Sequence, residues 1–429
     1  MAGFRVIVLG AGPAGLFTAH ALAAAGIDFI VLERQPEIVR YQGALLVVWP
    51  PLVRLLDQLG LSEQLKKFST RITTKTSFTH SGEPLSSDRI FAALEEELGY
   101  PTIGLSRGNL LHILYENLPE NKTKVRTNAH AVNIETHKDR VKVHLADGSV
   151  VEGSIVIGAD GVHSPARELI QRLGSDSSAA GDSKPTMVTT YMSLFGQTRG
   201  VREDIALGDF AESHGPGTAS QSTRLDDAMY FTVLKRLDKP TSEKKKVHER
   251  GSRQIRIKLK EIWPLREQAN AVLLHQEEGL ADKWYHGRIV IVGDAAHKMT
   301  SINGQGALSA VLSATTLVNK LHGALQKESS PSTEELEAAF ADYQTSRKEA
   351  AGAVVGLGFK MTRFITWTDE GNEAQDRKSS LENHATDEGK KRFLPGFVLS
   401  PLLDFIPYES KQGKTPWAIN SISSSRPQL

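Results

Sequence analysis

The residues best suited to chemistry lie in two glycine-bearing turns, one near the start of the chain and one far along it. The first turn runs from Gly10 to Gly15 and has a further glycine at Gly12. Gly10 permits a tight bend, Gly12 lets the backbone approach a pyrophosphate, and Gly15 lets a helix pack closely against a strand. This spacing predicts a dinucleotide site whose phosphates face a helix N-terminus.

The segments around this turn are those that such a site requires. Residues 4–9 are apolar and predict a buried strand, residues 14–25 are rich in alanine and predict a helix, and residues 29–32 predict a second strand. Glu33 follows directly, and its carboxylate is placed to accept both hydroxyls of an adenosine ribose. An acid at this point argues against a ribose 2′-phosphate. With strand, helix and acid in place, a purely structural turn is the weaker interpretation.

The second turn extends the nucleotide site. An apolar run over 288–292 predicts a strand that ends in Gly293 and Asp294, where a carboxylate can hold a polyol such as ribityl. After the glycines at Gly304 and Gly306, a helix is expected from about Ala307 to residue 321. Its positive end would stabilise negative charge on a reduced flavin ring. Since a nicotinamide dinucleotide needs no second polyol clamp, the arrangement favours FAD stretched between the two turns.

A third segment, residues 154–167, also shows a strand followed by a glycine turn and a helix start. A strand ends in Asp160 and Gly161, then Ser164 predicts an N-cap and Pro165 the first helical residue. Together the three segments resemble the single-component, group A FAD-dependent monooxygenases of the aromatic-hydroxylase type. The resemblance implies that the Asp160 element is tied to FAD and to NAD(P)H.

The resemblance is closer to one fungal branch, the epoxidase-like monooxygenases of indole-diterpene and meroterpenoid pathways. Its motifs are matched at 40–61, 106–115, 284–288 and 297–300, and the likeness covers about residues 3 to 325. It implies that Glu33 binds the adenosine ribose, Arg107 the phosphate or ribityl region and Asp294 the ribityl chain. It further implies that the flavin is lined by the backbone around Ala44, Val47 and Ala307.

The activity that this resemblance implies is reduction of FAD by NAD(P)H, reaction with dioxygen, and epoxidation or hydroxylation of a bulky apolar secondary-metabolite intermediate. The chain departs from the branch at Ser301, where proline is expected, at Leu308, where asparagine is expected, and at Leu312 and Ser313, which replace an acidic pair. These departures leave two alternatives open. One is a flavoprotein oxidase or cyclase, and the other is an FAD-bearing homologue without turnover.

His214 is the candidate catalytic residue outside the FAD motifs. It lies in the segment between the FAD motifs, just before Gly215, Pro216 and Gly217. A histidine there could act as general acid toward an epoxide or peroxide. The alternative is an exposed loop histidine.

Composition narrows the class of protein and of partner. The chain has 429 residues, and its 51 lysines and arginines balance 50 acids, so no bulk charge directs it to nucleic acid. Cysteine is absent, which excludes disulfides, cysteine-ligated metals and a cysteinyl-flavin bond. We expect no metal, a small-molecule substrate and a cytoplasmic location.

The expected fold class is α/β, with a Rossmann-type FAD-binding domain, an inserted substrate domain that contains a sheet, and a C-terminal tail. We expect the FAD-binding domain at 1–178 and 281–365, the substrate domain at 179–280 and the tail at 366–429. Residues 368–391 are polar and predict a mobile loop. The apolar run after them is broken by prolines and is too short to span a membrane. The tail is expected to cap the active site or to touch a membrane surface.

Overall fold

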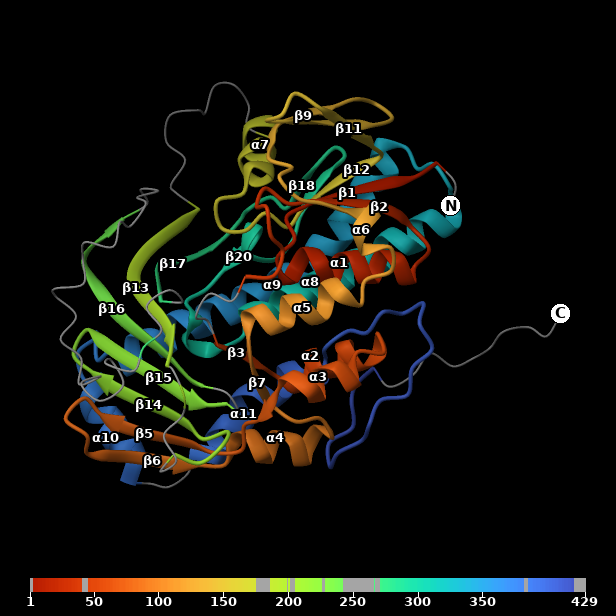
Figure 1. The fold of residues 1–429 in the computed structure, drawn as a ribbon. Coiled ribbons are helices and arrows are strands. Elements are labelled where there is room, and N and C mark those ends of the chain that lie inside the picture. Colours follow the sequence, from red (N-terminus) through yellow and green to blue (C-terminus); the bar gives the residue numbers. More distant parts are fainter. Residues whose placement is uncertain are drawn as a thin grey trace.

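The computed structural model describes residues 3–40, 45–174, 186–198, 200, 205–225, 228–241, 266, 271–381 and 385–419. Two large sheets dominate the described part, one flanked by long helices and one beside the C-terminal helices (Figure 1). The three glycine-bearing segments predicted to hold FAD belong to the first sheet and its connections.

The first sheet has six strands in the order β18-β19-β12-β1-β2-β8. Its central strands β1, β2, β12 and β19 run parallel and are built mainly of buried Val, Ile and Leu, as expected where both faces are covered. This strand order is that of a Rossmann-type nucleotide-binding sheet, which confirms the predicted fold class. The bounds are β1 Arg5–Leu9, β2 Asp28–Leu32, β8 Val125–Arg126, β12 Ile155–Gly158, β18 Tyr285–His286 and β19 Ile289–Ile291.

Long helices pack together on one face of this sheet, and a small sheet lies on the other side (Figure 1). The helices are α1 Pro13–Ala24, α5 Arg107–Glu116, α8 Gly306–Lys327 and α9 Thr333–Ile365. The start of α9 is fixed by a capping box between Ser332 and Glu335. The small sheet has the order β11-β10-β9, with β9 Ala131–Thr136, β10 Val141–Leu145 and β11 Val150–Gly153.

The second large sheet has eight strands in the order β20-β17-β13-β16-β15-β14-β5-β6. It takes in more of the chain than the expected insert 179–280, because β5 pairs parallel to β14 and β20 pairs with β17. Such pairing between distant segments leaves no trace in local periodicity. The bounds are β5 Lys75–Thr79, β6 Pro84–Asp88, β13 Met187–Gln197, β14 Phe210–Gly215, β15 Thr218–Arg224, β16 Met229–Thr241, β17 Val272–Leu280 and β20 His297–Lys298.

Shorter elements join the two sheets. A three-stranded sheet, β3-β7-β4, lies between them in Figure 1, and two 3-10 turns follow β19. The bounds are β3 Leu45–Val48, β4 Thr70–Arg71, β7 Ile103–Ser106, α2 Pro50–Gln58, α3 Ser62–Phe68, α4 Ile90–Leu98, α6 Asn121–Lys124, α7 Pro165–Leu173, η4 Gly293–Ala295 and η5 Ser301–Asn303.

Most of the described residues within 368–391 lie in helices, so the prediction of a mobile loop is wrong for them. Helix α10 spans Asn372–Leu381 and α11 spans Ala385–Val398. Helix α10 is polar throughout and has no apolar stripe from which a helix could be predicted. Phe393 and Phe397 of α11 pack on Trp49, with ring centroids 4.9 and 5.5 Å away.

Beyond α11, residues 399–419 run as a strap over α2 and α4. The buried guanidinium of Arg54 donates from Nε to the Ser410 hydroxyl at 2.7 Å and lies 4.1 Å from the Trp417 ring. Within the described part of the chain, no helix is long and apolar enough to cross a membrane.

Candidate functional site

A cavity of about 830 Å³ runs from the first glycine turn to the inner face of the eight-stranded sheet. Ligand sites generally have volumes of this order. One end is lined by Gly12, Arg107, Asp294 and Ala307, and the other by strands β5, β6 and β14 with helices α10 and α11. The cavity therefore joins the predicted FAD segments to the second sheet.

The glycine turn has no room for side chains at two of its positions. Gly10 has φ +95°, and a Cβ there would lie 2.6 Å from the Ala159 carbonyl oxygen. A Cβ on Gly15 would lie 1.9 Å from the Gly10 carbonyl oxygen. At Gly12, in contrast, the nearest atom to such a Cβ is Nη2 of Arg107 at 4.0 Å. The turn is closed toward the sheet and open toward the cavity.

The N-terminus of α1 faces this open side with no side chain capping it. Its backbone N–H groups and the helix dipole are therefore available to an anion. Arg107 lies beside Gly12, and its guanidinium makes no hydrogen bond to any residue that the structure describes. Burial lowers the pKa of this guanidinium, and the neighbouring Arg40 lowers it further. A pyrophosphate at this point would satisfy both the helix end and Arg107, so these residues fit the FAD diphosphate.

Glu33 lies at the end of β2 and is buried. Its Oε2 accepts a hydrogen bond from the Ala11 N–H at 2.8 Å, and its Oε1 accepts one from the Gln35 N–H at 2.9 Å. These bonds fix the carboxylate against the glycine turn. Each oxygen retains a lone pair, so contact with an adenosine ribose stays a prediction that the geometry allows.

Asp294 lies in η4, just after β19, and lines the cavity. Its Oδ2 accepts from Nζ of Lys298 at 3.0 Å, and its side chain is 37% exposed. Burial opposes the charge on Lys298, but Asp294 more than offsets it and the pKa of Lys298 is raised. An acid that is anchored on one side and open on the other suits the polyol chain for which it was predicted.

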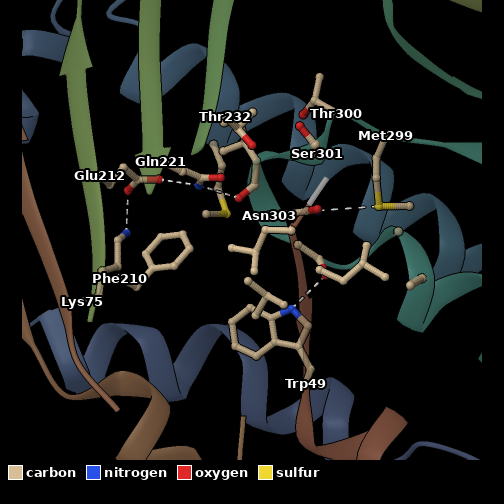
Figure 2. Close-up of a pocket in the computed structure, with 18 of the residues that line it drawn as sticks. Trp49, Lys75, Phe210, Glu212, Gln221, Thr232, Met299, Thr300, Ser301 and Asn303 are labelled. Carbon is tan, nitrogen blue, oxygen red and sulfur yellow. Dashed lines mark hydrogen bonds and ion pairs between the residues drawn. The ribbon is translucent and has the colours of Figure 1, made fainter. Parts of the chain in front are cut away.

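The expected flavin-lining positions come together from three segments. Val47 of β3 and Ala307 of α8 line the cavity, and a Cβ on Gly304 would lie 3.2 Å from Cβ of Val47. The Trp49 indole donates to the Gly304 carbonyl at 3.1 Å (Figure 2). Helix α8 begins at Gly306 with no side-chain cap, so its N-terminal donors remain available. Ala44, the remaining predicted position, lies outside the described residues.

Asp160 follows β12 beside the first glycine turn, where its Cα would lie 3.2 Å from a Cβ on Gly10. Its Oδ2 accepts from the Ala166 N–H at 3.2 Å, while its buried Oδ1 has no partner among the described residues. Burial raises the pKa of this carboxyl. Ala159 and Gly161, on either side of it, line the cavity, whereas the Asp160 side chain bonds the start of α7.

His214 is buried on strand β14, and its interpretation as an exposed loop histidine is wrong. Its Nδ1 lies 2.7 Å from Oδ2 of Asp376 and its Nε2 lies 3.0 Å from Oε2 of Glu212. Burial disfavours the charged ring, but the bonds to Asp376 and Glu212 prevail and the pKa of His214 is raised. Because both ring nitrogens are engaged, His214 must release one carboxylate before it donates a proton to a substrate.

The inner face of the second sheet carries polar residues that sequence reasoning missed. Lys75 of β5 donates from Nζ to Oε2 of Glu212 at 2.7 Å, and Gln221 of β15 donates from Nε2 to Oε1 of Glu212 at 2.7 Å (Figure 2). A signal existed for Glu212, because Phe210, Glu212 and His214 alternate along one face of a strand. Lys75 and Asp376 have no such signal, since β5 and α10 are distant in sequence.

The C-terminal helices complete the cavity. Helix α10 contributes Gln375, Asp376 and Ser379, and α11 contributes a run from Ala385 to Phe393. Of the two roles expected for the tail, this geometry supports the cap over the site.

Comparison with known proteins agrees with this geometry. The family described as FAD binding domain matches residues 4–356. The FAD-dependent monooxygenase srdH of Neurospora crassa is 35% identical over 447 residues, covering 97% of this chain and 98% of that protein. The FAD-dependent monooxygenase ptmM of Penicillium ochrochloron is 32% identical over 387 residues, covering 84% and 88%.

Solved structures agree on the fold. HpxO of Klebsiella pneumoniae, complexed with FAD and uric acid, superposes with a TM-score of 0.73 at 22% identity and covers 92% of this chain and 96% of that one. The Diels-Alderase PyrE3 superposes with a TM-score of 0.68 at 21% identity, covering 93% and 82%.

FAD is the cofactor of this family, with NAD(P)H as the reductant, and the glycine turn, the open N-terminus of α1 and the acid after β19 line one cavity. With these features and an FAD-binding family match over most of its length, the chain belongs to the FAD-dependent monooxygenases.

Proposed function

We propose that the enzyme oxidises a bulky apolar intermediate of secondary metabolism, by epoxidation or hydroxylation. The observation that carries the proposal is the single cavity that joins the FAD segments to a largely apolar wall under the second sheet. That wall is lined by Phe91, Phe195, Phe210, Phe231, Met361 and Phe364. The names of the fungal relatives, all FAD-dependent monooxygenases, support the same chemistry.

FAD, when bound, accepts hydride from NAD(P)H and activates dioxygen. The chain's own residues supply binding, orientation and exclusion of water. We assign the diphosphate to Arg107 and the N-terminus of α1, the adenosine ribose to Glu33, and the ribityl chain to Asp294. Val47, Gly304 and Ala307 would then border the ring, and the uncapped N-terminus of α8 could stabilise negative charge on it.

Exclusion of water falls to the C-terminal helices. Phe393 lines the cavity and stacks near Phe397, and both rings pack on Trp49. Since a dry site strengthens polar interactions with the reacting groups, α11 contributes to catalysis by covering the cavity rather than by reacting.

The departures from the family pattern give the alternative functions little support. Leu308 and Leu312 are buried in the core on α8, whereas Ala307 and Ala310 of the same helix line the cavity. These two replacements therefore alter the packing behind the wall and leave the wall itself in place. Only Ser301 among the departures lines the cavity.

The test uses the intermediate that accumulates when the gene is deleted in its native pathway. The purified yellow holoenzyme should consume NAD(P)H and dioxygen in equal amounts with this compound, and the product should gain an oxygen atom by mass spectrometry. Release of FAD by heat, followed by chromatography, identifies the cofactor. Consumption of NAD(P)H with stoichiometric peroxide and no product would favour an oxidase, and no consumption would favour a protein without turnover.

A further inference from the structure

A cluster of charged side chains faces the cavity at the end formed by β5, β6, β14 and α10. We call it the far-end cluster, and its members are Lys75, Asp88, Glu212, His214 and Asp376. Apart from Asp88 they are joined by hydrogen bonds: Lys75 and His214 share Oε2 of Glu212, and His214 also bonds Asp376. A ligand in this mostly apolar cavity can hydrogen-bond only to a member of the cluster that has an unused donor or acceptor.

Glu212, His214 and Asp376 hold one another. Oε2 of Glu212 accepts from Lys75 and His214, and Oε1 accepts from Gln221. Both nitrogens of His214 are engaged. Oδ2 of Asp376 also accepts from the Trp367 indole at 2.8 Å. These groups have little left to offer a ligand.

Lys75 is the exception. An ammonium has three N–H donors, and among the residues that the structure describes Nζ of Lys75 donates to Glu212 alone. The side chain is 23% exposed and lines the cavity, so the remaining donors face the space that a substrate would fill. Burial disfavours its charge, yet the carboxylate of Glu212 prevails and raises the pKa of Lys75.

The charges around Lys75 restrict what it can bind. Cations that line this end are Lys75, His214 and Arg392. Acids that line it are Asp88, Glu212, Asp376 and Glu388. Burial raises the pKa of Asp88. Even when Asp88 is counted as neutral, the positive charges of the three cations do not exceed the negative charges of the remaining three acids. A carboxylate would enter a region without surplus positive charge, and an ammonium would meet N–H donors. A neutral oxygen acceptor meets neither obstacle.

We propose that Lys75 binds a neutral carbonyl or hydroxyl oxygen of the substrate and so sets the direction in which the apolar body lies. In Figure 2, Lys75 and Glu212 lie on one side, next to Phe210 of the apolar wall, and the loop residues Met299, Thr300, Ser301 and Asn303 lie on the other. A molecule held by its oxygen at Lys75 extends along this apolar wall toward that loop, where the flavin is assigned. The substrate class is therefore an apolar skeleton with a neutral oxygen at one end. This inference rests on the proposed function.

The test compares binding of three matched probes to the FAD-loaded enzyme: decalin, decalone and decalin carboxylate. Binding is followed through the change in flavin absorbance. Wild-type enzyme should bind decalone at least tenfold more tightly than decalin, because a charge-assisted hydrogen bond is added. It should bind the carboxylate no more tightly than the ketone.

The variant Lys75→Met should lose the preference for decalone over decalin, and Lys75→Arg should retain it. Lys239→Met, an exposed lysine on β16 of the same sheet, should behave as wild type. If Lys75→Met fails to fold because Glu212 loses a partner, the double variant Lys75→Met with Glu212→Gln removes the ion pair as a unit. Equal binding of decalone and decalin by wild type, or a preference that survives in the methionine variants, overturns the assignment.

The same samples separate this inference from the proposed function. If the enzyme consumes oxygen with NAD(P)H and the pathway intermediate but does not prefer decalone, the role proposed for Lys75 is wrong and the monooxygenase function stands. If the enzyme prefers decalone through Lys75 but consumes no oxygen, the binding role of Lys75 stands and the proposed reaction is wrong.

Discussion

Replacing Glu33 with alanine removes an acceptor that two backbone N–H groups share. The Ala11 N–H lies 2.8 Å and the Gln35 N–H 2.9 Å from its oxygens, and the side chain is buried. Leaving such donors unpaired costs about 1–3 kcal/mol each, so with two donors the apoprotein should lose about 2–6 kcal/mol of unfolding free energy. If the carboxylate also accepts the ribose hydroxyls, FAD affinity should fall at least tenfold, or about 1.4 kcal/mol.

The assay must separate loss of the turn from loss of the ribose contact. We would titrate each apoprotein with FAD and with an analogue that lacks the 2′-hydroxyl of the adenosine ribose, following quenching of flavin fluorescence. Wild type should prefer FAD over the analogue, and Glu33→Ala should bind the two equally, as in a double-mutant cycle. Glu37→Ala, an exposed acid in the same loop, is the matched control and should change neither stability nor affinity.

Two results would contradict the roles assigned to Glu33. Should Glu33→Ala lower stability and yet keep the wild-type preference for FAD over the analogue, the carboxylate supports the turn and does not face the ribose. Should stability be unchanged, the hydrogen bonds to Ala11 and Gln35 do not carry the weight assigned to them.

Three further predictions follow from the same geometry. Asp294→Ala should impair FAD retention more than the exposed Asp282→Ala, and equal losses in FAD titrations would contradict the polyol assignment. Because the pKa of His214 is raised on folding, its charged ring stabilises the folded protein at a pH below the ordinary histidine pKa, and this stabilisation is lost as the pH rises through the folded pKa. The difference in unfolding free energy between wild type and His214→Gln, measured in urea, should therefore be larger at about pH 6 than at about pH 9. Burial, assisted by the nearby Arg347 guanidinium, lowers the pKa of His297 to about 4. The unfolding free energy of wild type should therefore fall by about 3 kcal/mol as the pH drops from the ordinary histidine pKa to about 4, as measured by urea unfolding. Ser313→Asp, which puts a carboxylate against Nε2 of His297, should abolish most of this loss.

The FAD end of the cavity could be predicted because its residues sit in local patterns. A strand, a glycine turn and a helix follow one another at Gly10 to Gly15, and Asp294 comes directly after a strand. The parallel sheet then brings these strand ends to one edge. Sequence order alone therefore predicts that Glu33 and Asp294 lie at the same edge of this sheet.

The substrate end could not be predicted in the same way. Lys75 meets Glu212 only because β5 pairs parallel to β14, and Asp376 reaches His214 from a polar helix that lacks an apolar stripe. For His214 the sequence signal was present but incompletely interpreted. Pro216 and Gly217 form the two-residue connection between β14 and β15, a hairpin turn, so the residues before them continue a strand rather than a loop.

The departures from the family pattern are matched by partners within this chain. Ser313, which stands where an acid is usual, lies with its hydroxyl 2.8 Å from Nε2 of His297, a suitable partner for a histidine that is neutral near pH 7.

Ser301, which stands where proline is usual, has the backbone N–H that proline lacks, and this N–H donates to Oε1 of the buried Gln276 at 2.9 Å. The side chain of Gln221 donates to the Ile302 carbonyl at 3.0 Å. Two side-chain amides of the eight-stranded sheet, Gln276 and Gln221, thus hold the loop beside the assigned flavin, in place of the rigidity that proline would supply. Gln221 also bonds Glu212, the partner of Lys75. A substrate oxygen bound at Lys75 would therefore join the same hydrogen-bonded network that holds the loop. This network links substrate binding to the position of the loop beside the assigned flavin, and the replacement of proline by Ser301 supplies one of its bonds.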